Sequence, residues 1–266
     1  MQRERSTIKA AGRRLAVQRL RPDRARDGPP LVFLHEGLGC IAMWKDFPSR
    51  LCDRLRLEGV VYDRWGHGLS EPLDRPRDTR YLHDEALVFL PEVLRELGGE
   101  RAALVGHSDG GTIALLFAAA FPRAAAAVVT EAAHVFVEEA TLAGIRAAGA
   151  AYAATDLPIR LARYHGEKTD GLFRAWHETW LSPAFRGWNI EAELPRVACP
   201  TLVLQGELDE YGTAAQVGAI ARGVAGPVET GLLPGCAHVP HHQAADAVLE
   251  RVARFLERHL AGEIGR

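Results

Sequence analysis

Short apolar runs that alternate with helix-length segments constrain the fold of this chain more than any other feature of its sequence. The first run, Pro30–His35, reads Pro-Leu-Val-Phe-Leu-His. Because nearly every residue in such a run is apolar, each strand is expected to be covered on both of its faces. Further runs of the same texture are Leu57–Tyr62, Ala102–Gly106, Ala125–Thr130, Pro200–Leu204 and Pro227–Leu233.

Helix-length segments lie between or after these runs, and the last of them shows a clear apolar periodicity. In this last segment, Ala244–His259, the apolar residues Val248, Val252 and Phe255 recur at helical spacing. Strand-like and helix-like segments therefore alternate, which predicts an α/β fold with a mostly parallel sheet and helices on both faces. A hairpin over Thr7–Arg21 is expected to precede this pattern. The predicted helices are Met43–Arg56, Tyr81–Leu97, Gly111–Phe121, Ala214–Arg222 and Ala244–His259.

One region interrupts the alternation, because the segment before the fifth run contains helix-like stretches but no strand-like run. An insertion of this kind after a strand is expected to form a helical cap over one end of the sheet. We therefore predict a core of residues 1–136 and 190–266 and a cap of residues 137–189. Trp176 and Trp180 lie in the cap and are candidates for substrate contacts, with packing inside the cap as the alternative role.

The charge balance and the cysteine pattern disfavour several classes of protein. Lys and Arg together number 32 and Asp and Glu 34, so the net charge of −2 disfavours a nucleic-acid-binding protein. No stretch is apolar for the roughly 18 residues that a membrane span needs, and the residues after Met1 do not resemble a signal peptide. The cysteines are scattered, with no pair spaced to bind zinc. We expect a cytoplasmic protein that acts on a small-molecule substrate, without a nucleic-acid or membrane partner, a metal or an organic cofactor.

A serine between small residues follows one of the apolar runs and is the strongest chemical signal in the chain. Residues 106–111 read Gly-His-Ser-Asp-Gly-Gly and lead from a strand-like run into an apolar helix-like segment. A serine that projects from so tight a strand-to-helix turn requires small residues two positions before and after it, because the strained backbone leaves no room for side chains there. We therefore predict that Ser108 is a catalytic nucleophile rather than part of a structural turn.

A nucleophilic serine needs a base that an acid orients, and in chains with this turn the acid and the histidine follow the serine in that order. Asp209 follows the fifth apolar run closely, and His238 follows the sixth. Because all three groups then lie at carboxyl ends of strands, they are expected to meet at one edge of the sheet. The two later histidines are expected to lie in solvent at the start of the last helix. The candidates that we rank lower are Glu207, Glu210, His241 and His242.

Hydrolysis through a serine also needs N–H donors for the developing oxyanion. One is expected to be the backbone N–H of Asp109, which directly follows the nucleophile. The other is expected from the loop after the first apolar run, which reads His-Glu-Gly-Leu-Gly at residues 35–39. Within that loop, the position relative to the strand favours the N–H of Gly37.

These motifs resemble those of the α/β-hydrolase superfamily, and the resemblance extends from the first apolar run to the last helix. Residues 63–70 read Asp-Arg-Trp-Gly-His-Gly-Leu-Ser, similar to the Asp-x-Arg-Gly-x-Gly-x-Ser turn of members that carry a cap. Trp65 stands where that family usually has Arg, and Glu36 stands where its oxyanion loop usually has Gly. The resemblance implies the α/β-hydrolase fold and a serine hydrolase that cleaves a small carboxylic ester through an acyl-enzyme.

The Ser-Asp-Gly-Gly turn further resembles valacyclovir hydrolase-like, or biphenyl hydrolase-like, esterases. In those esterases the acidic residue after the serine helps to recognise the amino group of amino-acid esters. Asp109, helped by Glu36, is therefore a candidate to bind a cationic substrate group, and a helix-capping role is the alternative. Other readings of the same scaffold are a C–C bond hydrolase of dienoic ring-fission products, a thioesterase, a lactonase, or a non-catalytic ligand-binding or signalling protein.

Overall fold

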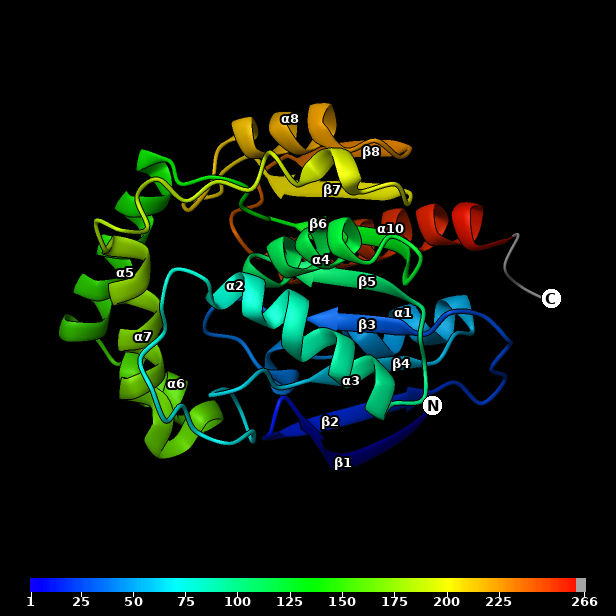
Figure 1. Ribbon diagram of the computed structural model, residues 1–266, viewed down its shortest axis with the longest axis horizontal. Helices are drawn as coiled ribbons and strands as arrows, with labels where there is room; N and C mark the ends of the chain where they lie inside the picture. Colours follow the sequence, from blue (N-terminus) through cyan, green and yellow to red (C-terminus); the bar gives the residue numbers. More distant parts are fainter. Residues whose placement is uncertain (262–266) are drawn as a thin grey trace.

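The computed structural model describes residues 1–261 and contains an eight-stranded sheet with helices on both faces (Figure 1). The strand order is β1-β2-β4-β3-β5-β6-β7-β8, and every neighbouring pair from β4 to β8 is parallel. β2 is antiparallel to both β1 and β4, so only the N-terminal hairpin departs from parallel pairing. The predicted fold class is confirmed. The strands are β1 (Gln2–Ala10), β2 (Arg13–Arg21), β3 (Leu31–Leu34), β4 (Gly59–Tyr62), β5 (Ala102–His107), β6 (Ala125–Glu131), β7 (Thr201–Gly206) and β8 (Val228–Leu233).

Alternate side chains of the central strands supply two separate hydrophobic cores, one on each face of the sheet. Val32 and Leu34 of β3 belong to the core that also contains α4, whereas Leu31 and Phe33 belong to the core that contains α10. Figure 1 shows α3, α4 and α8 on one face and α10 with α1 on the other. Both faces are therefore covered, which is why the strands are apolar throughout. The helices are α1 (Phe47–Leu55), α3 (Leu90–Glu96), α4 (Asp109–Ala120), α8 (Ala214–Gly223) and α10 (Ala245–Leu260).

The predicted helix Tyr81–Leu97 is interrupted in the structure, and a proline explains the interruption. It consists of α2 (Tyr81–Asp84), a π-helical turn at Glu85–Phe89 and then α3. Pro91 has no N–H to donate to the carbonyl group of Leu87, four residues earlier, and its ring would clash with that carbonyl in a regular α-helix. The wider π-helical turn accommodates both effects.

Three helices between β6 and β7 lie together beyond the carboxyl ends of the parallel strands, at the left of Figure 1. Lys168 joins this layer to the core, since its Nζ donates to the carbonyl oxygens of His67 at 3.2 Å and Gly68 at 2.6 Å. The N–H of Gly68 also donates to Nδ1 of His165 at 3.0 Å. The helices, which all fall in the segment predicted to form the cap, are α5 (Glu139–Ala154), α6 (Leu157–His165) and α7 (Thr169–Leu181).

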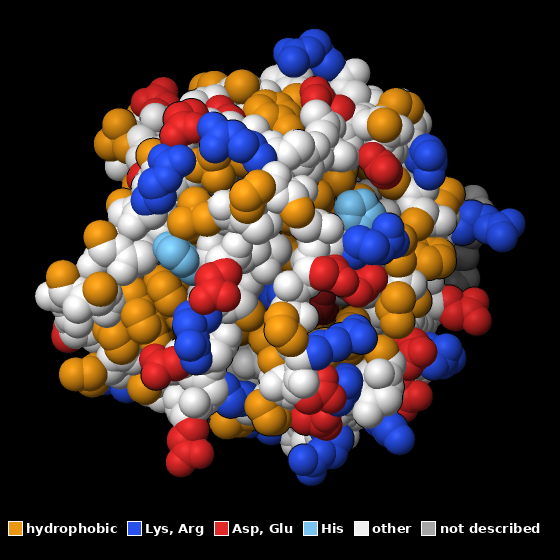
Figure 2. Space-filling model, turned by 60° about the vertical axis from the view of Figure 1, so that its left-hand side comes forward, with side chains coloured by type: hydrophobic (Ala, Val, Ile, Leu, Met, Phe, Trp, Pro, Cys, Tyr) orange, Lys and Arg blue, Asp and Glu red, His pale blue; other side chains and the backbone are white. Residues whose placement is uncertain are grey.

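The face of the molecule that includes these three helices carries charges of both signs. Figure 2 shows the Lys and Arg side chains interspersed with Asp and Glu side chains over that face, rather than segregated by sign. Among residues 1–261, no helix has both the length and the apolar character that crossing a membrane would require.

Candidate active site

Ser108 lies on a strained turn between β5 and α4. Its backbone has φ 53° and ψ −117°, a region that non-glycine residues rarely adopt. A Cβ atom on Gly106 would lie 2.2 Å from the carbonyl oxygen of Gly110, and one on Gly110 would lie 1.8 Å from the carbonyl oxygen of Leu34. The small residues at both positions are therefore required by the close approach of backbone to backbone, as the sequence pattern indicated.

Asp209 and His238 form a hydrogen-bonded pair at the carboxyl ends of β7 and β8. Nδ1 of His238 donates to Oδ1 of Asp209 at 2.8 Å, and the N–H of Tyr211 donates to the same oxygen at 2.9 Å. Burial raises the pKa of the Asp209 carboxyl group, but the hydrogen bond and charge of His238, the N–H of Tyr211 and the nearby His134 together outweigh burial and lower the pKa overall. Because the carboxylate holds the proton on Nδ1, Nε2 of His238 is left as the acceptor in the neutral ring.

A cavity of about 90 Å³ between the sheet edge and the cap brings the predicted site residues together. Ser108 and His238 both line it, and Asp209 lies behind the histidine. The other predicted residues that line it are Glu36, Gly37, Asp109, Trp176 and Trp180. The sequence-derived set thus converges on one cavity from both the core and the cap.

The two predicted oxyanion donors lie on either side of this cavity. Asp109 is the first residue of α4, so its N–H has no partner inside the helix. Gly37 is packed closely beneath the cap, since a Cβ atom on it would lie 2.4 Å from Nε1 of Trp176 and 3.4 Å from Oδ2 of Asp109. Both residues line the cavity that Ser108 also lines, and their backbone N–H groups remain the predicted oxyanion donors.

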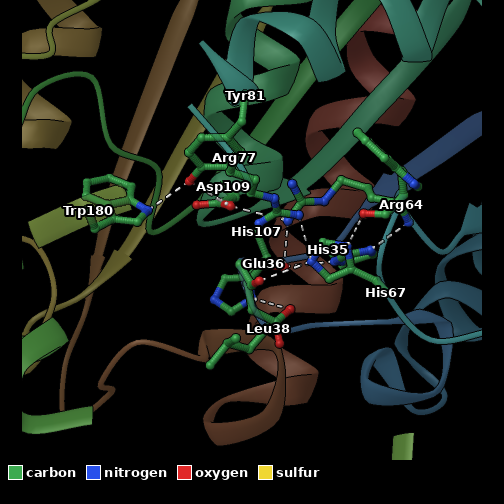
Figure 3. Close-up of polar contacts among 12 residues, drawn as sticks. His35, Glu36, Leu38, Arg64, His67, Arg77, Tyr81, His107, Asp109 and Trp180 are labelled. Carbon is green, nitrogen blue, oxygen red and sulfur yellow. Dashed lines mark hydrogen bonds and ion pairs between the residues drawn. The ribbon is translucent and has the colours of Figure 1, made fainter. Parts of the chain in front are cut away.

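The carboxylate of Asp109 already has partners within the protein (Figure 3). Its Oδ2 accepts hydrogen bonds from Nη2 of Arg64 at 3.3 Å and from the hydroxyl group of Tyr81 at 3.1 Å. The hydroxyl of Tyr81 in turn accepts from Nε1 of Trp180 at 2.8 Å, which connects the cap to the residue beside the nucleophile. Arg64 and Asp109 are both almost fully buried, so this ion pair supplies the positive charge that the carboxylate needs.

Arg64, whose side chain reaches Asp109, stands one residue before the position at which the similar family turn usually has Arg. Its Nη2 also donates to the carbonyl oxygen of Glu36 at 2.8 Å, so the same side chain supports the loop that carries Gly37. Trp65, at the usual arginine position, points elsewhere: its indole N–H donates to the carbonyl oxygen of Pro72, and its ring lies 4.4 Å from the guanidinium carbon of Arg13. A buried guanidinium thus pairs with the carboxylate of the residue that follows Ser108.

The carboxylate of Glu36 faces His107 rather than standing free in the cavity. Oε2 of Glu36 lies 3.5 Å from Nδ1 of His107, and Nε2 of His107 lies 2.7 Å from the carbonyl oxygen of His238. The carboxylate near Nδ1 and the carbonyl acceptor at Nε2 both favour an imidazolium. Burial lowers the pKa of His107, but the carboxylates of Glu36 and Glu131 outweigh burial and raise the pKa overall.

The prediction that His241 lies in solvent is wrong. His241 is only 4% exposed, in the short helix α9 (Pro240–Gln243), and its Nδ1 and N–H both donate to Oε2 of Glu131, at 2.9 and 3.0 Å. Glu131 ends β6, so α9 folds back over the sheet edge and covers this pair. His242 is partly buried too, and burial lowers its pKa to about 4.

Several residues of the cavity were missed by the sequence analysis. The core contributes His134, which follows β6 by three residues, and Leu38, while the cap contributes Thr141 and Ile145 of α5. Only His134 carried a usable signal, because it follows a strand's carboxyl end as His238 does. The last missed residue is Tyr211, which lines the wall beside Asp209. Among the described residues, no group of three or more His, Cys, Asp or Glu side chains is arranged to hold a metal ion.

Known proteins resemble this chain in sequence and in fold. The model of the alpha/beta hydrolase family matches residues 31–251 of the chain. A proline iminopeptidase of Lactobacillus delbrueckii subsp. lactis is 29% identical over 93 residues, a match that spans 35% of this chain and only 32% of that protein. Serine hydrolase BPHL of Mus musculus is 28% identical over 224 residues, which cover 80% of this chain and 74% of that protein. The solved 2-hydroxy-6-oxo-6-phenylhexa-2,4-dienoate hydrolase from Rhodococcus sp. strain RHA1 has a TM-score of 0.80 at 15% identity, over 96% of this chain and 99% of that chain.

Proposed function

This chain belongs to the alpha/beta hydrolase family, and we propose that it is a serine hydrolase that cleaves a small carboxylic ester through an acyl-enzyme. Ser108 attacks the ester carbonyl group while Nε2 of His238 takes the serine proton. Asp209 holds the imidazole in the tautomer that leaves Nε2 free and stabilises the imidazolium that forms. The backbone N–H groups of Gly37 and Asp109 stabilise the negative charge on the tetrahedral intermediate. Water then hydrolyses the acyl-enzyme by the same steps.

One observation carries this proposal above all others: a serine on a strained turn shares a small cavity with a histidine that a buried carboxylate orients. The strain at Ser108 persists only because Gly106 and Gly110 allow the surrounding backbone to approach closely. The names of the relatives support hydrolysis in general, and the cavity of about 90 Å³ supports a small substrate.

The proposal does not extend to amino-acid esters. Oδ2 of Asp109 accepts from Arg64 and Tyr81, and the carboxylate of Glu36 faces His107. Each carboxylate therefore already has a cation beside it, and an incoming ammonium group would have to compete with a buried guanidinium or imidazolium. The capping and structural alternative for Asp109 fits this geometry better than the amine-binding one.

Turnover of p-nitrophenyl butyrate by the wild-type protein and the Ser108→Ala variant tests the proposal. Loss of the nucleophile is expected to lower kcat by several powers of ten, because members of such a group act as a unit. Alanine fits the turn at this position, so circular dichroism is expected to show an unchanged fold. Equal turnover by a folded Ser108→Ala variant would contradict the proposal, and so would a wild-type protein that hydrolyses no ester or thioester.

A further inference from the structure

Two polar atoms in the candidate active site have no partner in the protein, although both are buried. Of the described residues that line the cavity, only His134 and Thr141 contribute a buried side-chain polar atom without a hydrogen bond, at Nδ1 and Oγ1 respectively. His134 is 3% exposed and Thr141 is 1% exposed. An unmade hydrogen bond at a buried polar atom is costly, so such atoms in a site usually have a partner in the bound state.

The surroundings of His134 decide which ring nitrogen carries the proton. Its Nε2 lies 3.0 Å from the carbonyl oxygen of Tyr211, which can only accept, so Nε2 must donate. Burial and the nearby His238 lower the pKa of His134, which keeps the ring neutral. A neutral ring with its proton on Nε2 has a bare lone pair on Nδ1, and this nitrogen is therefore an acceptor.

Thr141 offers the complementary function from the cap. It lies in the first turn of α5, and its hydroxyl group can donate one hydrogen bond and accept others. His134 comes from the core and Thr141 from the cap, so a ligand that satisfies both would be held between the two layers. The remaining wall is largely aromatic and aliphatic, with Trp176, Trp180, Tyr211 and Ile145.

The charged groups of the cavity are already balanced, so the free atoms call for an uncharged ligand group. Asp109 pairs with Arg64, and Glu36 faces His107. A substrate hydroxyl group can donate to the lone pair of Nδ1 and accept from the Thr141 hydroxyl at the same time, whereas an ether or a ketone oxygen cannot donate.

We propose that the natural substrate is an ester with a neutral hydroxyl group, which donates to Nδ1 of His134 and accepts from Oγ1 of Thr141. This inference rests on the proposed function, because it places the hydroxyl in the same cavity as Ser108. A site that hydrogen-bonds a substrate hydroxyl discriminates strongly against the analogue that lacks it, since its own polar atoms are then left unpaired. The hydroxylated ester is therefore expected to react at least about tenfold faster than its deoxy counterpart.

The experiment compares matched esters by the release of protons. The first set contains methyl butyrate, methyl 2-hydroxybutyrate and methyl 3-hydroxybutyrate, and the second contains propyl butyrate and 2-hydroxyethyl butyrate, which carry the change on the alcohol side. The readout is the ratio of kcat/KM for each hydroxylated ester to that of its deoxy partner. At least one ratio is expected to be about ten or more in the wild-type protein.

Substitutions of Thr141 and His134 connect that ratio to the named atoms. Thr141→Val removes the hydroxyl but keeps the shape, and is expected to bring the ratio close to one, whereas Thr141→Ser is expected to keep it. His134→Gln keeps a donor for Tyr211 without an acceptor at the Nδ1 position, and is expected to lower the ratio as well. Thr179→Val is the matched control, because Thr179 lies in α7, bonds to the carbonyl oxygen of Ala175 and does not line the cavity.

Two results would overturn the inference: ratios near one for every pair in the wild-type protein, or a high ratio that neither Thr141→Val nor His134→Gln lowers. Either result leaves the proposed function standing if the protein still hydrolyses butyrate esters through Ser108. If no ester is hydrolysed and Ser108 does not react with a fluorophosphonate, the proposed function itself fails and this inference fails with it.

Discussion

Two carboxylate–imidazole pairs at the same edge of the sheet are each joined by a hydrogen bond to Nδ1 of the histidine, and they differ in what surrounds them. Asp209 and His238 are joined at 2.8 Å, and Glu131 and His241 at 2.9 Å, each through Nδ1 of the histidine. Both carboxylates are fully buried, which raises the pKa of each, but their hydrogen bonds and the nearby imidazole groups together outweigh burial and lower it. By these criteria the pairs are nearly identical.

What separates them is access to the serine. The ring of His238 lines the cavity that Ser108 also lines, whereas the ring of His241 packs against Trp44 and Phe47, with ring centroids 4.6 and 5.5 Å apart. An acid–imidazole pair is therefore not in itself evidence of catalysis, since packing decides whether the imidazole meets a substrate. We infer that the Asp209–His238 pair serves the reaction. The Glu131–His241 pair, which these aromatic rings cover, serves the stability of this edge of the sheet, and we call it the covered pair.

The largest effect is expected from removing the charge of Asp209, the acid of the pair that faces the cavity. Asp209→Asn is expected to lower kcat by about 10⁴-fold, because an amide no longer enforces the tautomer with a free Nε2. The matched change in the covered pair, Glu131→Gln, is expected to keep kcat within a few-fold of wild type. Steady-state kinetics on p-nitrophenyl butyrate measures both. A larger loss in Glu131→Gln than in Asp209→Asn would reverse the assignment of the two pairs.

The covered pair is expected to dominate in stability instead. His241→Ala leaves the buried carboxylate of Glu131 without its partner, and breaking a buried ion pair typically costs about 3–5 kcal/mol. Urea denaturation followed by tryptophan fluorescence measures the free energy of unfolding. Combining the substitution with Glu131→Gln is expected to recover part of the loss. A His241→Ala variant as stable as the wild-type protein would show that the pair contributes nothing to the fold.

A smaller effect on rate is expected from Arg64, the buried cation that pairs with Asp109. Arg64→Gln leaves the carboxylate of Asp109 uncompensated near the developing oxyanion. A negative charge about 6 Å away costs roughly 3 kcal/mol at an effective dielectric near 20, or about a hundredfold in kcat. The double variant with Asp109→Asn removes the offending charge and is expected to recover part of the rate. If the double variant is no faster than Arg64→Gln alone, the guanidinium acts through packing and not through charge.

The smallest expected effect concerns the pH dependence of stability through His107. Its pKa is raised by the nearby carboxylates, so its stabilising contribution is fully present below the unfolded-state pKa of about 6.5 and is lost as pH rises through the folded-state pKa. Glu36→Gln removes one of those carboxylates. Urea titrations from pH 6 to 9 are expected to show a free energy of unfolding that declines with pH in the wild-type protein and declines less in the variant. Parallel declines would contradict an imidazolium at this position.

The sequence predicted the Asp209–His238 pair because both residues closely follow strands. Apolar runs locate the carboxyl ends of parallel strands, and Asp209 and His238 come within a few residues of those ends. The covered pair was missed because α9 turns His241 back toward Glu131, which lies 110 residues earlier in the chain. Nothing in the local pattern of Pro-His-His-Gln distinguishes a solvated turn from one that closes over a carboxylate.

The way in which the cap docks on the core could not be predicted from the sequence either. Thr141 and Ile145 reach the cavity only because α5 lies over the sheet edge, and helix periodicity does not define that docking. The pairing of Arg64 with Asp109 joins residues 45 positions apart in the chain, and nothing in the turn at residues 63–70 predicts it. His134 is different, because it stands after a strand's end and could have been included by the same rule that located His238.

Reaction of the protein with a fluorophosphonate, mapped by peptide mass spectrometry, tests the comparison of the two pairs most directly. The reagent requires a serine that an adjacent base activates. The account predicts that the label is found on Ser108 in the wild-type protein and in folded His241→Ala, and that the rate of labelling falls by several powers of ten in His238→Ala. Labelling of another residue, or a His238→Ala variant that reacts at the wild-type rate, would contradict it.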